Sequence, residues 1–334
     1  MKQTSICLIG AGGIAAAHID AANFLSSSVK ITAIADPNLE VAQKLATNLD
    51  AKAYTNFEEV LADSAIASTI DAVIICTPPS VRLPIVEAAI KNKMHVLMEK
   101  PIASTLEDAE KLTQLAAQNP QITCAIAYCH RFESGITHIK KLVESGDFGR
   151  LVRVENTFAA PAPQMKDHWM SDPKVSGGGS LIDTACHSLD MFQYLAGTPE
   201  LVGAVLFNGW EGRGESNATV LVAATDKSEL PVAGTINSGW NEAMRFQVNV
   251  VTEKASFAYD YCKPNIVSKQ TAGVEGIEEI NLGDQPGRFG GQLKAFVEKI
   301  TNGTESDLAT FADGLNVANV IADAQGHTQC ECCS

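Results

Sequence analysis

The sequence has no cluster of positive charge and no long apolar segment. Its 334 residues include 25 Lys and Arg against 39 Asp and Glu, which gives a formal net charge of −14 at pH 7. Nucleic acids and anionic membrane surfaces both favour clustered Lys and Arg, and no block of basic residues occurs. We therefore expect neither as a partner. No apolar run approaches the length of a membrane span.

Cysteine is present, at nine positions, but in settings that do not suggest disulfide bonds. Cys7, Cys76 and Cys124 lie within apolar, strand-like runs, where a free thiol packs as a small hydrophobic group. The short apolar run after Met1-Lys2 soon reaches Gly10, so we expect no signal peptide. A reduced, cytoplasmic protein is the simpler prediction.

The last residues include His327 and three further cysteines, Cys330, Cys332 and Cys333. Thiolates with an imidazole can bind zinc. No second ligand pair at a standard spacing accompanies them, and chain ends are usually loose. We therefore predict no metal site.

A glycine-rich turn follows the first apolar run. Residues 6–9 form a short apolar strand that leads into Gly10-Ala11-Gly12-Gly13-Ile14-Ala15 and then into a helical run. In this context a G-x-G-x-x-G/A pattern is typical of dinucleotide binding, because Gly10 makes the tight turn and Gly12 lets the backbone approach a pyrophosphate. The N–H groups that open the helix, including those of Gly13 and Ile14, then face the phosphates.

An acidic residue follows at the spacing that this pattern needs. The second strand, residues 29–35, ends at Asp36, 21 positions after Ala15. A carboxylate there can accept hydrogen bonds from the adenosine ribose and repels a 2′-phosphate, so NAD is favoured over NADP. The alternative is that Asp36 only caps the helix after Pro37. The glycine turn and the acid agree with each other, which favours the cofactor interpretation.

Strand-like and helix-like runs alternate up to residue 127, which predicts a doubly wound parallel sheet over residues 1–127. Ligands of such sheets bind beyond the carboxyl ends of the strands. Gly10, Asp36, Thr77-Pro78 and Glu99-Lys100 all fall at those ends, so one cofactor can contact them all.

Lys100 could donate to a substrate hydroxyl. The alternative is that it is a solvated lysine before an ordinary turn. A cis Lys100–Pro101 bond is possible for such a proline.

A second glycine-rich stretch, Gly177-Gly178-Gly179, precedes a helix that we expect to end at Gly197. Ser180 is the expected N-cap. Asp183 and His187 are four residues apart, so both project from one face of the helix. A carboxylate beside an imidazole suits acid–base chemistry. The alternative is a His–Asp pair that only ties the helix to its neighbours.

These motifs resemble the glucose–fructose oxidoreductase and inositol dehydrogenase family. The matching segments are the glycine turn at residues 10–15, Thr77-Pro78-Pro79, Glu99-Lys100-Pro101, Arg131-Phe132, and residues 177–179 leading to Asp183, His187 and Asp190. The family often has Asn where this chain has Cys129, which leaves the cofactor contacts there open.

The resemblance implies an NAD(P)-dependent oxidoreductase that interconverts a hydroxyl and a ketone or lactone on a sugar, polyol or sugar derivative; with Asp36, we expect NAD as its cofactor. It implies Lys100, Asp183 and His187 as the catalytic trio, and Tyr128 and Trp169 as further substrate contacts. Trp169 is nearly as well explained as a surface anchor. Relatives of this fold also include NAD-dependent glycosidases and non-catalytic NAD-binding sugar sensors, and the intact trio is not expected in a sensor.

Residues 128–334 are expected to form an α+β domain for substrate binding and oligomerisation. Strand-like runs at residues 151–158, 201–207, 218–224, 231–237, 245–252 and 255–259 have no helices between the last five. They predict one large open sheet, mostly antiparallel. The resemblance implies that this sheet pairs subunits, so we expect a homodimer or homotetramer.

Overall fold

The computed structural model describes residues 3–226 and 228–327, which divide into two compact units. The first unit comprises residues 1–103, 107–129 and 286–312; the second comprises residues 104–106, 130–285 and 313–334. The cysteines of the C-terminal segment lie outside the described residues. Within the described part of the chain, no helix has the length and apolar character needed to cross a bilayer.

A seven-stranded sheet forms the centre of the first unit, in the order β15-β6-β5-β4-β1-β2-β3. The strands are β1 (Thr4–Ile9), β2 (Val29–Ala35), β3 (Lys52–Tyr54), β4 (Ala72–Ile75), β5 (His95–Met98), β6 (Cys124–Ile126) and β15 (Ala309–Thr310). All neighbours pair in parallel except β15, which runs antiparallel to β6. β1 and β4 are buried along their whole length, because helices cover both faces of such a sheet. The predicted doubly wound sheet is confirmed.

The helices of this unit follow the strands in the expected alternation. They are α1 (Gly13–Phe24), α2 (Leu39–Thr47), α3 (Phe57–Ala62), α4 (Ser64–Ala67), α5 (Arg82–Lys91), α6 (Leu106–Gln118) and α10 (Arg288–Asn302), with a short 3-10 turn, η1 (Pro79–Val81), before α5.

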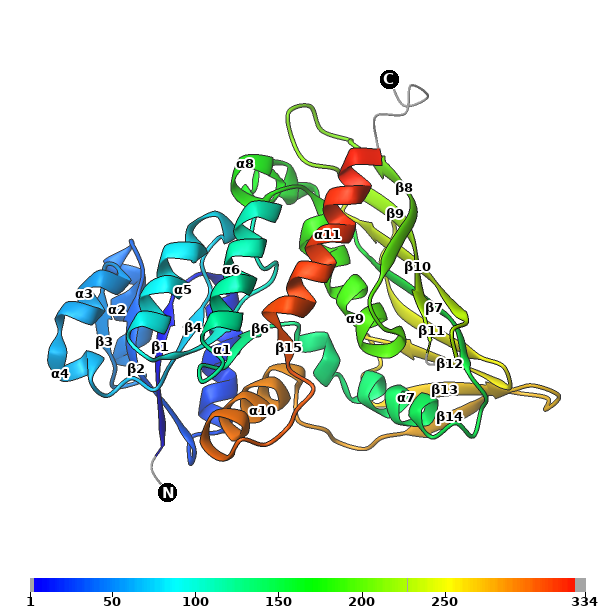
Figure 1. The fold of residues 1–334 in the computed structure, drawn as a ribbon, viewed down its shortest axis with the longest axis horizontal. Coiled ribbons are helices and arrows are strands. Elements are labelled where there is room, and N and C mark those ends of the chain that lie inside the picture. Colours follow the sequence, from blue (N-terminus) through cyan, green and yellow to red (C-terminus); the bar gives the residue numbers. More distant parts are fainter. Residues whose placement is uncertain (1–2, 227, 328–334) are drawn as a thin grey trace. The chain divides into compact units, whose positions relative to one another are not determined.

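One helix comes from far along the chain. α10 lies beside α1 (Figure 1), and its residues Leu293, Phe296 and Val297 belong to the core around β1 and β2. The boundary between the units falls after Cys129, close to the expected one after residue 127, but residues 286–312 return to the first unit. An amphipathic helix buries its apolar face wherever a complementary core is available, and the sequence pattern does not say which core that is.

An eight-stranded sheet forms the second unit, in the order β14-β13-β12-β11-β7-β10-β9-β8. Its strands are β7 (Leu151–Ala159), β8 (Glu200–Phe207), β9 (Asn217–Thr225), β10 (Pro231–Gly239), β11 (Arg245–Thr252), β12 (Ala255–Asp260), β13 (Ile266–Thr271) and β14 (Glu278–Asn281). β7 and β10 pair in parallel and the other neighbours are antiparallel. The expected large, mostly antiparallel sheet is confirmed.

The helices of the second unit cover one face of this sheet. Their bounds are η2 (Cys129–Phe132), α7 (Ser134–Glu144), η3 (Pro163–Asp167), η4 (Trp169–Ser171), α8 (Pro173–Ser176), η5 (Leu181–Ala185), α9 (Cys186–Ala196) and α11 (Phe311–His327). α9 packs on β7, β9 and β10, and α7 packs on β12 and β13 (Figure 1). Buried and exposed residues therefore alternate along strands such as β9.

Candidate active site

The glycine turn of the first unit has the geometry that its sequence predicts. Gly10 has φ +96°, and a Cβ atom there would lie 2.9 Å from the carbonyl carbon and oxygen of Cys76, so only glycine fits. At Gly12 and Gly13 a Cβ would meet nothing within 4 Å. No side chain caps α1 at Gly12 among the described residues. Gly12, Gly13 and Ile14 are exposed, so the N–H groups that open α1 are accessible to a pyrophosphate.

Asp36 lies at the entrance to this turn. Its Oδ2 accepts a hydrogen bond from the Ala11 N–H at 2.8 Å, and its Oδ1 accepts one from the Asn38 N–H, also at 2.8 Å. Asn38, not Asp36, caps α2, because its side chain accepts from Val41 N–H. The carboxylate is thus fixed beside the turn rather than used as a helix cap.

Two further strand ends carry predicted cofactor contacts. Thr77 and Pro78 follow β4, and Glu99 and Lys100 follow β5, at the same edge of the sheet as Gly10. The Thr77 Oγ1 is buried and has no hydrogen-bond partner in the described part of the chain, and a buried polar atom normally has one. With the open glycine turn, this orphan hydroxyl fits a bound dinucleotide. The Lys100–Pro101 peptide bond is cis.

A buried histidine–glutamate pair lies close to this edge. The Nε2 of His18, on α1, is 2.8 Å from the Oε1 of Glu99, and both side chains are buried. Burial alone would lower the pKa of His18, but Cys76 and Glu99 together raise it to about 10. The contact with His18 fixes the Glu99 carboxylate. His18 is not among the predicted site residues, because its only signal in the sequence is its place on the helix after the glycine turn.

The second glycine stretch is held by a carboxylate from elsewhere in the second unit. The buried Glu215 Oε1 accepts hydrogen bonds from Gly179 N–H at 2.9 Å and Leu181 N–H at 2.8 Å. The Glu215 carbonyl accepts from Ser180 N–H. The expectation that Ser180 caps the helix is wrong, because its side chain makes no capping bond and Glu215 satisfies the free N–H groups instead. Burial raises the pKa of Glu215, although these N–H bonds oppose the rise.

Close backbone contact explains the glycine at position 179. A Cβ there would lie 2.0 Å from the Glu215 carbonyl oxygen. We expect Gly179→Ala to lower the free energy of unfolding by about 1–3 kcal/mol or more, since overpacking forces the backbone to shift. Chemical denaturation measures this loss. Gly203→Ala is the matched control, because a Cβ at Gly203 meets nothing within 4 Å. Equal stability of the two variants would contradict the explanation.

Asp183 and His187 follow this loop on one helical segment. Asp183 lies in η5, a π-helical turn, and His187 lies in the first turn of α9. The helix ends before Gly197, which has φ +106°, as predicted. Single π-turns inside helices often occur at functional sites. Both residues are of intermediate burial.

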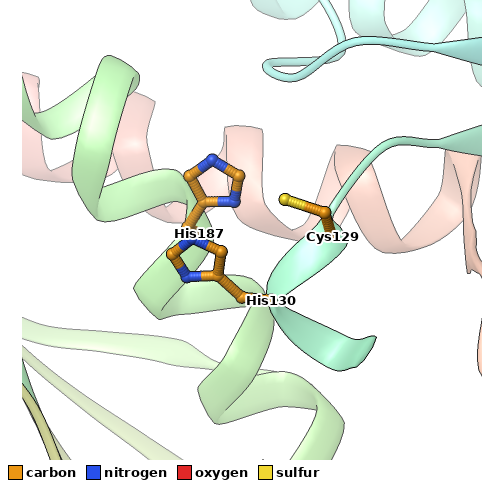
Figure 2. Close-up of side chains that lie close together, drawn as sticks. All are labelled: Cys129, His130 and His187. Carbon is orange, nitrogen blue, oxygen red and sulfur yellow. The ribbon is translucent and has the colours of Figure 1, made fainter. Parts of the chain in front are cut away.

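An unpredicted imidazole contacts His187. The rings of His130 and His187 are stacked, with centroids 4.2 Å apart and planes inclined by 8°. Figure 2 shows the two rings face to face, with Cys129, the first residue of η2, drawn beside them. His130 is buried and its ring also contacts Phe158 and Tyr261. Stacked rings direct their in-plane lone pairs side by side rather than at one point, which does not favour a shared metal ion.

The next residue, Arg131, forms a buried ion pair with Asp190 of α9. Its Nε and Nη2 donate to the two carboxylate oxygens at 2.8 and 2.6 Å. The Asp313 carboxylate lies 3.6 Å from Nη2. Burial raises the pKa of Asp190 to about 6 even though Arg131 opposes the rise. The pair ties α9, which carries His187, to η2.

The remaining candidates belong to different units. Tyr128 is buried in the first unit, two residues after the end of β6, and Lys100 lies in the same unit. Trp169 opens η4 in the second unit, which also holds Asp183 and His187. Trp169 is partly buried. The roles of these five residues stay predictions.

Comparison with known proteins agrees with this architecture. The model of an oxidoreductase family with an NAD-binding Rossmann fold matches residues 4–128, and the model of the GFO/IDH/MocA C-terminal domain matches residues 136–258. The matches cover the parallel sheet of the first unit and most of the large sheet of the second.

Individual relatives are distant. The chain is 27% identical to inositol 2-dehydrogenase from Corynebacterium glutamicum (strain R), over 59% of this chain and 55% of that protein. It is 24% identical to glucose-6-phosphate 3-dehydrogenase from Bacillus subtilis (strain 168), over 96% of this chain and 95% of that protein.

A solved structure of levoglucosan dehydrogenase, in complex with NADH and levoglucosan, superposes with a TM-score of 0.87. The superposition covers 98% of this chain and 97% of that one, at 20% identity, which shows a shared fold. With the glycine turn, the strand-end residues and both family matches in place, the chain belongs to the GFO/IDH/MocA family of NAD(P)-dependent oxidoreductases.

Proposed function

We propose that the protein is an NAD-dependent dehydrogenase that interconverts a hydroxyl group and a ketone or lactone on a sugar, polyol or related compound. The observation that carries this proposal is the pair Asp183 and His187, half-buried on one helical segment whose first N–H groups are fixed by Glu215. The relatives named above act, by their names, on inositol, glucose 6-phosphate and levoglucosan, which supports a polyhydroxylated substrate.

The proposed roles follow from the chemistry of each side chain. When bound, NAD accepts a hydride from the substrate carbon or, as NADH, returns it. In oxidation, a ring nitrogen of His187 takes the proton of the substrate hydroxyl. Lys100 donates a hydrogen bond to the same oxygen and stabilises its developing negative charge. Asp183 holds a neighbouring hydroxyl and orients His187. Tyr128 and Trp169 contribute further substrate contacts.

The first test is NADH formation with a panel of sugars, sugar acids, inositols and small polyols, each with NAD and with NADP. A signal with NAD on one group of compounds supports the proposal and identifies the substrate class. Silence across the panel, with NAD binding established by fluorescence, contradicts it and favours a glycosidase that oxidises its substrate transiently, or a sensor.

Asp36 is proposed to set the preference for NAD. We expect Asp36→Asn to weaken NAD binding roughly 10- to 100-fold, since a hydrogen bond to a charged group contributes about 1.5–3 kcal/mol. Binding of NADP should improve, because the negative charge that repels a 2′-phosphate is gone. Fluorescence titration with each cofactor measures both constants. Asp50→Asn, at an exposed position beside Lys30, is the control. An unchanged ratio of the two constants would show that Asp36 does not select the cofactor.

We also propose a homodimer or homotetramer that pairs through the face of the eight-stranded sheet away from α7 and α9. Val205, Phe207 and Leu221 are exposed there, Val205 by 65% and Phe207 by 57%. An apolar patch of this kind is typical of an interaction surface. A reduced, cytoplasmic location is proposed as well, and none of the six cysteines in the described ranges forms a disulfide bond.

A further inference from the structure

Arg82 is a buried guanidinium that joins two neighbouring strand ends of the first unit. It is 2% exposed and opens α5. Its Nε and Nη2 donate to the Thr77 carbonyl, after β4, at 2.9 and 2.6 Å. Its Nη1 donates to the carbonyls of Glu99 and Pro101, and its Nη2 also donates to the Lys100 carbonyl at 3.3 Å.

A buried cation is costly unless it is compensated. Here the compensation comes from four backbone carbonyls, through bonds that are stronger than neutral ones because the donor is charged. The planar guanidinium offers five N–H donors in a fixed fork. Three consecutive carbonyls, at Glu99, Lys100 and Pro101, are therefore held relative to the end of β4.

The Lys100 backbone is held from its other side as well. The Glu99 Oε2 accepts a hydrogen bond from Lys100 N–H at 3.2 Å. The other oxygen of that carboxylate lies 2.8 Å from the His18 Nε2. The N–H of Lys100 is thus fixed by Glu99 and its carbonyl by Arg82, whereas the side chain is only half-buried.

We propose that Arg82 is a positioning residue for Lys100. It fixes the backbone of residues 99–101, so that the Lys100 side chain extends from one fixed backbone position at the carboxyl ends of the strands. The inference rests on the proposed function for what Lys100 does there. A lysine at position 82 cannot replace the arginine, because a single ammonium does not reach carbonyls on two strand ends at once.

The test compares Arg82→Ala and Arg82→Lys with the wild type. We expect kcat to fall roughly 10- to 100-fold in both, since a misplacement of about 1 Å can cost 100-fold. Millimolar methylguanidinium should restore part of kcat in Arg82→Ala but not in Arg82→Lys, where the lysine occupies the site. Arg82→Lys also serves if Arg82→Ala does not fold.

A second readout does not depend on turnover. The acetylation rate of Lys100, followed by mass spectrometry of its peptide, should change in Arg82→Ala and return toward the wild-type value with methylguanidinium. This measurement decides the proposal even if no substrate is found, so failure of the proposed function and failure of the positioning role are distinguishable.

Arg150 is the matched control. Its Nη1 also donates to backbone carbonyls, those of Leu151 and Pro231, but in the second unit. Arg150→Ala should change neither kcat nor the acetylation of Lys100. If Arg82→Ala loses thermal stability but keeps the wild-type kcat and Lys100 acetylation rate, Arg82 has only a structural role and the proposal is overturned.

Discussion

Replacing His187 with Asn is expected to lower kcat by about 10²–10⁴-fold, the usual contribution of a positioned general acid or base. Asn has a similar polar shape but cannot take up the hydroxyl proton at neutral pH. The Kd of NAD should stay close to the wild-type value, because His187 is proposed to act on the substrate. Steady-state kinetics on the substrate found by the panel, with NAD binding measured by fluorescence, checks both expectations.

His138 offers the matched control for this variant. It is also a partly buried histidine of the second unit, on α7, and no part of the proposed chemistry involves it. His138→Asn should keep most of the wild-type kcat. A His187→Asn variant with more than about a tenth of wild-type turnover would show that another group moves the proton.

Replacing Arg131 with Met is expected to lower the free energy of unfolding by about 3–5 kcal/mol, because one partner of a buried ion pair is removed. The Asp190 carboxylate is then left without its compensating charge. Burial raises the pKa of Asp190 to about 6 even with Arg131 present, against 3.8 for an ordinary carboxyl. Without Arg131 it should rise further. Urea denaturation at pH 7.5 measures the loss.

The pH dependence identifies the cause of that loss. The folded variant holds a proton on Asp190 more tightly than the unfolded chain does, so stability gained from protonation increases as the pH falls. We therefore expect the deficit to shrink between pH 7.5 and about 5.5. Adding Asp190→Asn should recover most of it at pH 7.5. A deficit that stays constant with pH, or is unaffected by the second substitution, would refute this account.

An exposed ion pair provides the comparison. Lys111 and Glu107 are four residues apart on α6, with Nζ and Oε1 2.7 Å apart, and both side chains are at least half exposed. Lys111→Met should cost less than about 0.5 kcal/mol, as is usual for such a pair. The contrast with Arg131→Met isolates the effect of burial from that of charge removal.

The fold was predictable where its elements carry a strong local pattern. β1 and β4 are uninterrupted apolar runs, and the alternation along β9 shows one buried face. β13 and β14 were not anticipated. The edge strand β14 is polar and mostly exposed, and β13 beside it has only one buried residue, so neither shows a clear periodic signal. The π-turn at Leu181–Ala185 gives no sequence pattern distinct from that of an α-helix.

The site was predictable where backbone conformation demands a residue type. Gly10 is recognisable because its φ and its contact with Cys76 leave room only for glycine. Glu215 was not, since it holds the backbone of Gly179 and Leu181 from more than thirty positions away and no spacing rule connects them. His130 stacks on the ring of His187, and Arg82 donates to backbone carbonyls. Neither contact needs a particular pair of residue types at a fixed spacing, so no sequence motif indicates it.

The late return of α10 and β15 to the first unit has a consequence during synthesis. Phe296 and its neighbours complete the core around β1, and β15 closes the edge of the sheet at β6. When only residues 1–129 have been synthesised, the nucleotide-binding unit therefore has an uncovered apolar face and an open sheet edge. That unit is complete only after residue 312 has emerged, so the whole of the second sheet is made while the first domain is still unfinished.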